Sequence, residues 1–310
     1  MDDQLLQTII IGLSNGMIYA LVALGYTLVY GIIELINFAH GDVFMLGSMI
    51  AFTFLVMFGV NTAMDPTLAL LLIVGVLLIT MIITSILNVS IERVAYRPLR
   101  SAPRLAPLIS AIGMSFVLQN VGLLWKGPAN LGFPDVIPNT NVLTSVLGLD
   151  TAIAISYKQI FVAVVTIPLL IVLTWFVSKT RQGKAMRATA QDPDTAGLMG
   201  IDVNRTIAIT FVIAGALAGA AGLVQILYNN TTVWNLGFRF GLNAFTSAVL
   251  GGIGNLQGAV LGGIVLGLIN AISDRYLSAQ WTNAIVFGVL IAILVFRPTG
   301  LLGQQLADRA

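Results

Sequence analysis

Charged side chains are scarce in this sequence. Only 9% of its 310 residues are Asp, Glu, Lys or Arg, whereas 57% are hydrophobic, and the mean hydropathy is +0.95. A soluble domain carries about 25% charged residues, because polar side chains must cover its water-facing surface. The composition therefore excludes an ordinary soluble fold and predicts a chain that resides in a membrane.

Several residue types and motifs that carry chemistry are also missing. Cysteine is absent, which excludes disulfides and thiolate metal sites, and a single histidine, His40, excludes sites built from several histidines. No Gly-x-x-x-x-Gly-Lys-Ser/Thr loop and no glycine-flanked nucleophile elbow occur. The basic segments lack interleaved aromatic residues, which argues against nucleic-acid binding. We therefore expect no metal, no cofactor, no ATP site and no catalytic residues.

Long apolar runs make up most of what is present. A hydrocarbon core of about 30 Å requires roughly 20 apolar residues to cross it. The runs cover residues 5–30, 44–60, 67–91, 105–125, 160–178, 206–228, 260–272 and 282–296. A glycine-rich run at 242–256 is a span, a half-helix or a re-entrant segment. All runs are continuous and lack the alternation of barrel strands. The sequence thus predicts an all-α, polytopic membrane bundle with about eight or nine membrane segments, including broken or re-entrant helices, and residues 1–310 form one transmembrane domain.

The positions of the basic residues predict the orientation. Two segments hold nine of the fifteen Lys and Arg: Arg93, Arg97, Arg100, Arg104, Lys179, Arg181, Lys184, Arg187 and Arg205. Basic segments next to spans remain in the cytoplasm, so we expect residues 179–205 to form a cytoplasmic loop. Residues 126–158 are rich in Pro, Gly, Asn and Thr and should form an extracytoplasmic loop. Counting the spans then places the N-terminus outside if residues 5–30 form one span, and the C-terminus in the cytoplasm if residues 242–256 cross.

The cytoplasmic segment 179–205 contains a helix signal. Asp192-Pro193 predicts a helix start, and the short helix would run from Asp194 to Met199 and stop at Gly200 in the left-handed conformation. Such a helix would suit docking into a groove of a soluble partner. The side chains offered to that partner would be Ala196, Leu198 and Met199. An ordinary solvated loop is the alternative interpretation.

Polar residues gather between the first two apolar runs. Asn37, His40 and Asp42 follow Glu34, next to sequence at membrane depth. Polar groups there are costly unless they face a cavity, a partner or water, and a helix broken at Gly41 would expose backbone groups to a cargo. We expect these three residues to line a translocation pathway. In the alternative interpretation Asp42 is only the cap of the following helix.

Glycines spaced by four residues predict close helix packing. Gly215 and Gly219 form one pair, and Gly254, Gly258 and Gly262 form a longer series. Polar residues within the apolar runs are further candidates to line a pathway. They are Asn15, Gln119, Asn243 and Thr246. Each of them could instead form a hydrogen bond between helices.

Several motifs occur in order along the chain. They are Gly-Tyr-Thr-Leu-Val-Tyr-Gly-Ile-Ile-Glu-Leu-Ile-Asn-Phe-Ala-His-Gly-Asp at 25–42, Ile-Glu-Arg-Val-Ala-Tyr-Arg-Pro-Leu-Arg at 91–100, Leu-Ile-Ser-Ala-Ile-Gly-Met-Ser at 108–115, Ala-Val-Leu-Gly-Gly-Ile-Gly-Asn at 248–255 and Phe-Arg-Pro-Thr-Gly-Leu-Leu-Gly at 296–303. This series resembles the bacterial branched-chain amino acid importer permeases. Length and spacing are most similar to the shorter permease subunit of the Liv system for leucine, isoleucine and valine.

The resemblance implies one subunit of an ATP-binding-cassette importer in the bacterial inner membrane. Its partners would be a second homologous permease, two ATP-binding subunits that hydrolyse the ATP, a periplasmic substrate-binding protein and membrane lipid. The ATPase-docking loop of related importers carries Glu-Ala-Ala-x-x-x-Gly. Asp194, Thr195, Ala196 and Gly200 match it in part, with Asp in place of Glu and Thr in place of the first Ala. The implied ATPase-coupling helix therefore lies within 179–205.

Two alternatives to this function differ in cargo and in energy source. Close relatives of the family carry urea, short amides or other small polar solutes, so the same machinery could serve another cargo. A secondary transporter driven by protons through Glu34, His40 or Asp42 would need no ATP. The missing P-loop agrees with an importer whose ATPases are separate chains.

Overall fold

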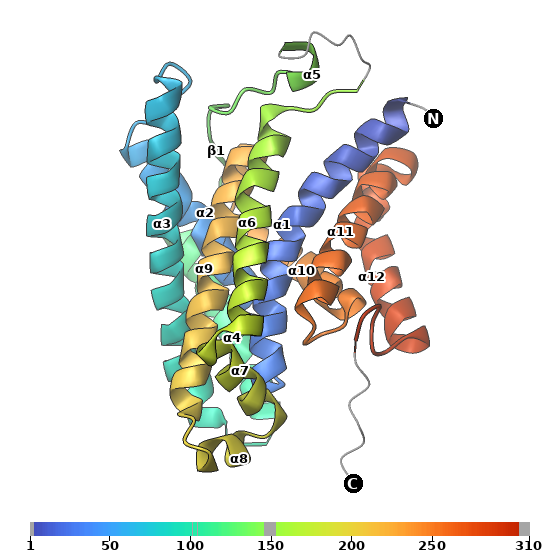
Figure 1. Ribbon diagram of the computed structural model, residues 1–310. Helices are drawn as coiled ribbons and strands as arrows, with labels where there is room; N and C mark the ends of the chain where they lie inside the picture. The colour runs from blue at the N-terminus through green and yellow to red at the C-terminus, as the bar shows by residue number, and fades with distance from the viewer. Residues whose placement is uncertain (1–2, 101, 104, 146–152, 304–310) are drawn as a thin grey trace.

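Long helices run the length of the molecule in the computed structural model (Figure 1), which describes residues 3–100, 102–103, 105–145 and 153–303. The long helices are α1 (Asp3–Ile33), α2 (His40–Met57), α3 (Pro66–Ile91), α4 (Leu105–Lys126), α6 (Tyr157–Lys179), α9 (Val203–Asn229), α10 (Leu236–Gly251), α11 (Leu256–Ser273) and α12 (Ala279–Phe296). The short elements are η1 (Glu92–Tyr96), η2 (Arg97–Leu99), β1 (Leu131–Gly132), α5 (Val142–Ser145), α7 (Arg181–Gln191), α8 (Pro193–Leu198), β2 (Thr231–Thr232) and η3 (Asp274–Ser278). β1 and β2 pair antiparallel. The expected all-α membrane fold is confirmed.

Seven stretches of the described chain are long and apolar enough to cross a membrane. One of them, Leu256–Phe296, has 41 residues and contains both α11 and α12. The chain reverses between them at η3, where Ser278 has φ +127°, and the two helices lie side by side (Figure 1). α10 has 16 residues and is about 24 Å long at a rise of 1.5 Å per residue. When α11 and α12 are counted separately, the seven stretches become eight, and the shorter α10 makes nine. This agrees with the eight or nine segments expected.

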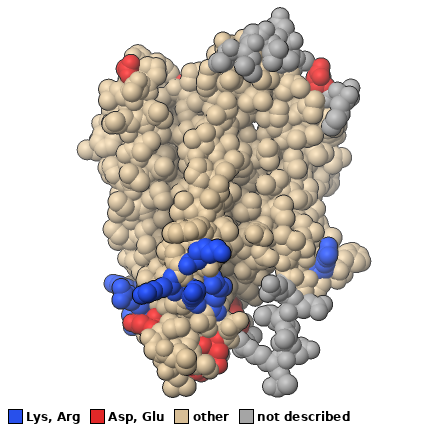
Figure 2. Space-filling view, in the orientation of Figure 1, with Lys and Arg blue, Asp and Glu red and all other residues tan. Residues whose placement is uncertain are grey.

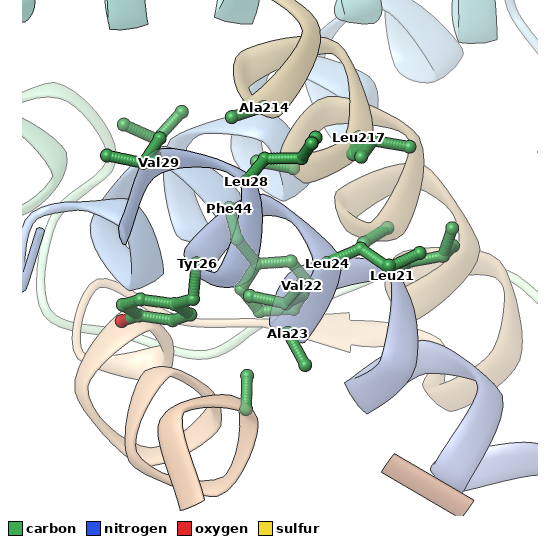
Figure 3. Close-up of a cluster of buried hydrophobic side chains, with 14 of the residues drawn as sticks. Leu21, Val22, Ala23, Leu24, Tyr26, Leu28, Val29, Phe44, Ala214 and Leu217 are labelled. Atoms are coloured by element: carbon green, nitrogen blue, oxygen red, sulfur yellow. The ribbon is translucent and has the colours of Figure 1, made fainter. Parts of the chain in front are cut away.

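The core is formed by three of the long helices. Most of α1, α2 and α9 is buried, whereas α3, α4, α6 and α12 expose most of their apolar side chains. Figure 3 shows part of the core, where Leu21, Leu24 and Leu28 of α1 lie beside Ala214 and Leu217 of α9. A helix that is apolar all round belongs inside a large protein or in a membrane. The peripheral helices therefore present their apolar surface to lipid or to another membrane chain.

Glycines allow the close helix contacts. A Cβ on Gly215 would lie 2.6 Å from the Thr84 carbonyl oxygen, and one on Gly219 would lie 3.0 Å from that of Thr80, so both glycines lie where α9 packs on α3. Gly258 and Gly262 of α11 similarly face the backbone of α10, at residues 251 and 247.

Gly254 does not belong to that helical face. It precedes α11, has φ +94°, and a Cβ built on it would meet no atom within 4 Å. The packing prediction for Gly254 is wrong because the chain turns there, and the spacing of four has meaning only within a helix.

The two basic segments lie at the same end of the molecule. Arg100 donates from Nη1 to Asn204 Oδ1 at 2.7 Å, which ties η2 to the start of α9. Figure 2 shows Lys and Arg side chains gathered at the end that carries α7 and α8, and on the face shown no charged side chain lies between them and the acidic side chains of the opposite end. α1 begins at that opposite end, together with β1 and α5 (Figure 1). Arg104 lies outside the described residues.

Candidate functional site

The chain is not helical between α1 and α2. Residues 34–39 separate the two helices, and Glu34 adopts φ +53°. α2 begins at His40, so Gly41 lies inside its first turn and does not break a helix. Ala39 occupies the cap position, and no side chain caps this helix. The cap interpretation of Asp42 is therefore wrong, because the helix begins two residues before it.

Four buried and two half-buried side chains around this break form what we name the polar cluster. It consists of Asn37, His40, Asp42, Tyr96, Ser115 and Gln119. The Tyr96 hydroxyl donates to Asn37 Oδ1 at 2.6 Å. The Ser115 hydroxyl donates to Asp42 Oδ2 at 2.5 Å, and Gln119 Nε2 donates to Ser115 Oγ at 3.1 Å. The structure thus brings Asp42 of α2 and Gln119 of α4, both expected pathway residues, into one hydrogen-bonded chain.

Tyr96 and Ser115 were missed by the sequence reasoning. Ser115 lies one helical turn before Gln119, and residues four apart share a helix face, so this signal was present. Tyr96 lies in the π-helical η1, where the usual helical periodicity does not apply. Its contact with Asn37 could not be inferred from the sequence.

Polar atoms of the cluster are buried without hydrogen bonds. Asn37, His40 and Asp42 are 2%, 0% and 1% exposed. Asn37 Nδ2, Asp42 Oδ1 and both ring nitrogens of His40 have no partner of good geometry in the described part of the chain, although the Val22 carbonyl of α1 lies beside the His40 ring. Buried polar groups are nearly always paired, so each exception needs an explanation.

The backbones of α2 and α10 touch beside the cluster. A Cβ on Gly41 would lie 2.5 Å from the Gly237 carbonyl oxygen and 2.8 Å from Gly241 Cα. A Cβ on Gly237 would lie 2.5 Å from Asp42 Oδ1. Tyr26 of α1 covers the same place, with its ring 4.9 Å from that of His40. The carboxylate oxygen without a partner therefore faces the bare backbone of α10.

The other expected pathway residues lie in a second group between α1, α10 and α11. Asn243 and Asn270 both donate from Nδ2 to the Tyr19 hydroxyl, at 3.2 and 3.1 Å. Asn15 is half-buried and lies one helical turn before Tyr19. Thr246 is fully buried, and its hydroxyl has no partner among the described residues. The structure does not join these residues to the polar cluster.

The basic segment forms α7 and the short helix α8. Asp192 caps α8 by accepting from the amides of Asp194 and Thr195 at 3.0 and 3.1 Å. The helix ends at Leu198, and Gly200 has φ +83°. The expected start and stop signals are confirmed, because an aspartate cap and a left-handed glycine define the ends.

The exposed side chains of this helix differ from those expected. Leu198 and Met199 are 88% and 79% exposed, but Ala196 is only 4% exposed. Ala196 therefore packs inside the protein and does not offer its side chain to a partner. Asp194, Thr195 and Gly200 are exposed. Two neighbouring apolar side chains that face water form the kind of patch that marks a protein contact.

Charged pairs tie each end of the molecule together. At the end with α8, Arg100 pairs with the buried Glu92, and burial lowers the pKa of Arg100 against the opposing effect of the Glu92 charge. At the opposite end, Lys158 Nζ lies 2.6 Å from Asp135 Oδ1. Burial opposes ionisation of Asp135, but hydrogen bonds from Lys158 and Asn230, together with the Lys158 charge, outweigh it and lower its pKa.

Comparison with known proteins gives one consistent result. A family model described as "Branched-chain amino acid transport system / permease component" matches residues 8–295. The permease protein BraD of a high-affinity branched-chain amino acid transport system from Pseudomonas aeruginosa is 45% identical, over 98% of this chain and 97% of BraD. LivH of Escherichia coli, named for the same kind of system, is 41% identical over 98% and 97%.

More distant relatives are named for a different cargo. The autoinducer 2 import system permease protein LsrC of Klebsiella pneumoniae is 29% identical, over 66% of this chain and 58% of LsrC. No solved structure matches this chain significantly.

Proposed function

This chain belongs to the branched-chain amino acid transport permease family, and we propose that it is a permease subunit of an ATP-driven importer for leucine, isoleucine and valine. The single observation that carries the proposal is the match over nearly the whole length, to relatives named for this transport. The helical membrane fold supports it, because a channel subunit must span the bilayer.

ATP hydrolysis belongs to partner chains in this proposal. The sequence has no P-loop, so two ATP-binding subunits bind and hydrolyse ATP at the cytoplasmic face. α8 docks on them through Leu198 and Met199, which are exposed and apolar. The basic residues beside α8 support a cytoplasmic location by the positive-inside rule.

Movement of α8 reaches the membrane region through hydrogen bonds. Asn204, close behind α8 in sequence, holds Arg100, and Arg100 pairs with Glu92 of η1. Tyr96 of the same π-helix holds Asn37 at the break between α1 and α2. A displacement of α8 therefore shifts the polar cluster. Discrete networks of this kind can carry coupling between distant sites.

The polar cluster lines the translocation pathway in this proposal. An amino acid has a charged ammonium and a charged carboxylate, which cannot enter hydrocarbon unaided. Polar side chains inside the membrane domain, such as Asn37 and Asp42, replace part of its hydration. The second group, around Tyr19 and Asn243, is a further polar surface at membrane depth.

The remaining partners complete the assembly. A second homologous permease packs on the exposed apolar helices, and lipid covers the rest. A periplasmic substrate-binding protein delivers the cargo at the end that carries residues 126–158. The complex resides in the bacterial inner membrane.

Uptake by the reconstituted complex tests the proposal. Proteoliposomes that hold this chain, the second permease and both ATPases should accumulate radiolabelled leucine when ATP is inside and the loaded binding protein is outside. Uptake by this chain alone, abolished by a protonophore and indifferent to ATP, would instead establish a secondary transporter. The control is the same complex without ATP.

A different cargo is the second candidate, and the likeness to LsrC favours considering it. Urea, short amides or other small polar solutes would use the same machinery. Calorimetry on the partner binding protein separates the candidates, because the binding protein delivers the cargo. Nanomolar to micromolar affinity for leucine is the expected outcome, and affinity for a neutral solute in its place contradicts the proposed cargo.

A further inference from the structure

The unpaired atoms of the polar cluster have the chemistry of one kind of ligand. Asp42 Oδ1 is a buried acceptor on an acidic side chain, and Asn37 Nδ2 is a buried donor. No ion pair to Asp42 forms within the described part of the chain. A free α-amino acid presents an ammonium group, which only donates, and a carboxylate, which only accepts. We propose that Asp42 and Asn37 bind the ammonium and the carboxylate of a zwitterionic amino acid in the membrane, and that α10 closes this site in the present conformation. The inference rests on the proposed function.

The apolar surroundings fit the side chain of such a ligand. A hollow of about 10 Å³ lies beside Tyr26, whose ring contacts that of His40. Its walls are Tyr26, Tyr30, Ile36, Phe245, Ala248 and Ile253. The hollow has room for about one water molecule, so an aliphatic side chain enters it only after the walls move apart. A polar pair beside an apolar hollow is the arrangement that a leucine-like molecule requires.

α10 supplies the moving wall. Phe245 and Ala248 of this helix, and Ile253 just after it, form half of the hollow. Gly237 and Gly241 of the same helix lie against Gly41 and Asp42. One displacement of α10 therefore uncovers the carboxylate and enlarges the hollow together.

The short length of α10 and the glycine turn after its C-terminal end allow this displacement. The helix has only 16 residues, and it is followed by Gly252 and Gly254 with φ of +104° and +94°. Positive φ angles of this kind are accessible to glycine at little cost, so the turn can change its backbone angles. Secondary transporters likewise form cargo sites at discontinuous helices, whose ends and unwound backbone contact the cargo.

Substitution in the complete complex tests the ligand contacts. Asp42→Asn removes the charge at constant size, and Asn37→Val removes the amide donor. With assembly intact, each should lower leucine uptake per ATP hydrolysed by about tenfold or more, the effect of losing a hydrogen bond to a charged group. The control is Thr80→Val on α3, outside the cluster. It also removes a buried polar group without a partner, in this case the Thr80 hydroxyl. It should keep uptake per ATP within about twofold of wild type.

The same experiment separates this inference from the proposed function. A wild-type complex that does not take up leucine refutes the proposed cargo. If the wild-type complex takes up leucine and either cluster variant keeps its uptake per ATP within twofold of wild type, the proposed binding site is refuted but the proposed cargo is not. If a cluster variant fails to assemble, the labelling experiment on position 42 described next tests the binding site instead.

Accessibility can be measured cleanly because this chain has no cysteine. In an Asp42→Cys complex, a small methanethiosulfonate reagent should label position 42 slowly at rest and at least about tenfold faster while the ATPases hydrolyse ATP in the presence of loaded binding protein, because ATP hydrolysis does not require the Asp42 carboxylate. Ser48→Cys, on the same helix and fully buried, is the control and should stay protected in both states. Equal protection of both positions during turnover, or fast labelling of position 42 at rest, would overturn closure by α10.

Discussion

At the residue scale, Asp42 and Ala196 are both almost fully buried, at 1% and 4% exposure. Asp42 is part of a polar cluster and does not cap a helix, because α2 begins at His40. Ala196 is buried, although the short helix around it was expected to present its side chain. Both differences depend on where a helix begins or which way it faces. Those are tertiary properties that packing decides.

The exposure of Leu198 and Met199 predicts a coupling defect without a folding defect. Leu198→Asp together with Met199→Asp should abolish ATP-driven uptake, because two charges would replace the apolar docking patch. The thermal stability of the isolated chain should change by less than about 0.5 kcal/mol per substitution, as expected for surface positions. Thr62→Asp, which adds a charge at an exposed residue of the opposite end but outside residues 126–158, is the control. Normal uptake by the double variant would exclude this face of α8 as the docking site.

Ala196 should behave in the opposite way. Ala196→Leu adds volume to a buried position, and overpacking costs typically about 1–3 kcal/mol. We therefore expect a lower unfolding temperature in detergent, together with impaired uptake. An unchanged unfolding temperature would mean that Ala196 is free to turn outward.

Acid should weaken the ion pair of Asp135 with Lys158. The pKa of Asp135 is lowered in the folded state. Its stabilising contribution is therefore complete above its unfolded value of about 3.9 and is lost as the pH falls through the lowered folded value. The unfolding temperature of wild type should fall more between pH 6 and pH 3 than that of Asp135→Asn. The difference should be small, because Asp135 is 47% exposed; equal falls would show that the pair adds no stability.

At the element scale, the sequence located the long helices other than α10 to within four residues, because apolar runs end where polar residues and glycines begin. The run at 242–256 was displaced from α10, which spans Leu236–Gly251. The runs at 105–125 and 160–178 correspond to α4 and α6. The π-helical η1 could not be anticipated, since nothing in its local sequence distinguishes it from an α-helix. The glycine series failed only at Gly254, where the helix had not yet begun.

Glycines on one helix pair give a sharp packing test. Gly215→Ala places a Cβ 2.6 Å from the Thr84 carbonyl oxygen, so it should destabilise the α3–α9 contact by about 1–3 kcal/mol. Gly75→Ala, in α3 with no atom within 4 Å of the new Cβ, should instead be neutral or stabilise by up to about 1 kcal/mol. Unfolding of both variants in detergent measures the difference, and similar effects would contradict the packing shown here.

At the scale of the whole molecule, the described chain contains nine long helices, counting α10, and an odd number of crossings would put its two ends on opposite sides of the membrane. The number of runs and the positions of the basic residues predict this topology. The way α10 packs on the start of α2 was not predictable, because the contact joins residues about 200 positions apart, through glycine backbone and the stacked rings of Phe44 and Phe240.

The contact between α2 and α10 also bears on how fast the proposed closure can be released. Gly41, Gly237 and Gly241 meet through backbone atoms, and beside them the rings of Phe44 and Phe240 stack with centroids 5.3 Å apart. Separating the two helices therefore has to break one aromatic pair, which is worth about 0.5–1.5 kcal/mol beyond the area it buries. Release of α10 then adds a step of that modest size to the transport cycle.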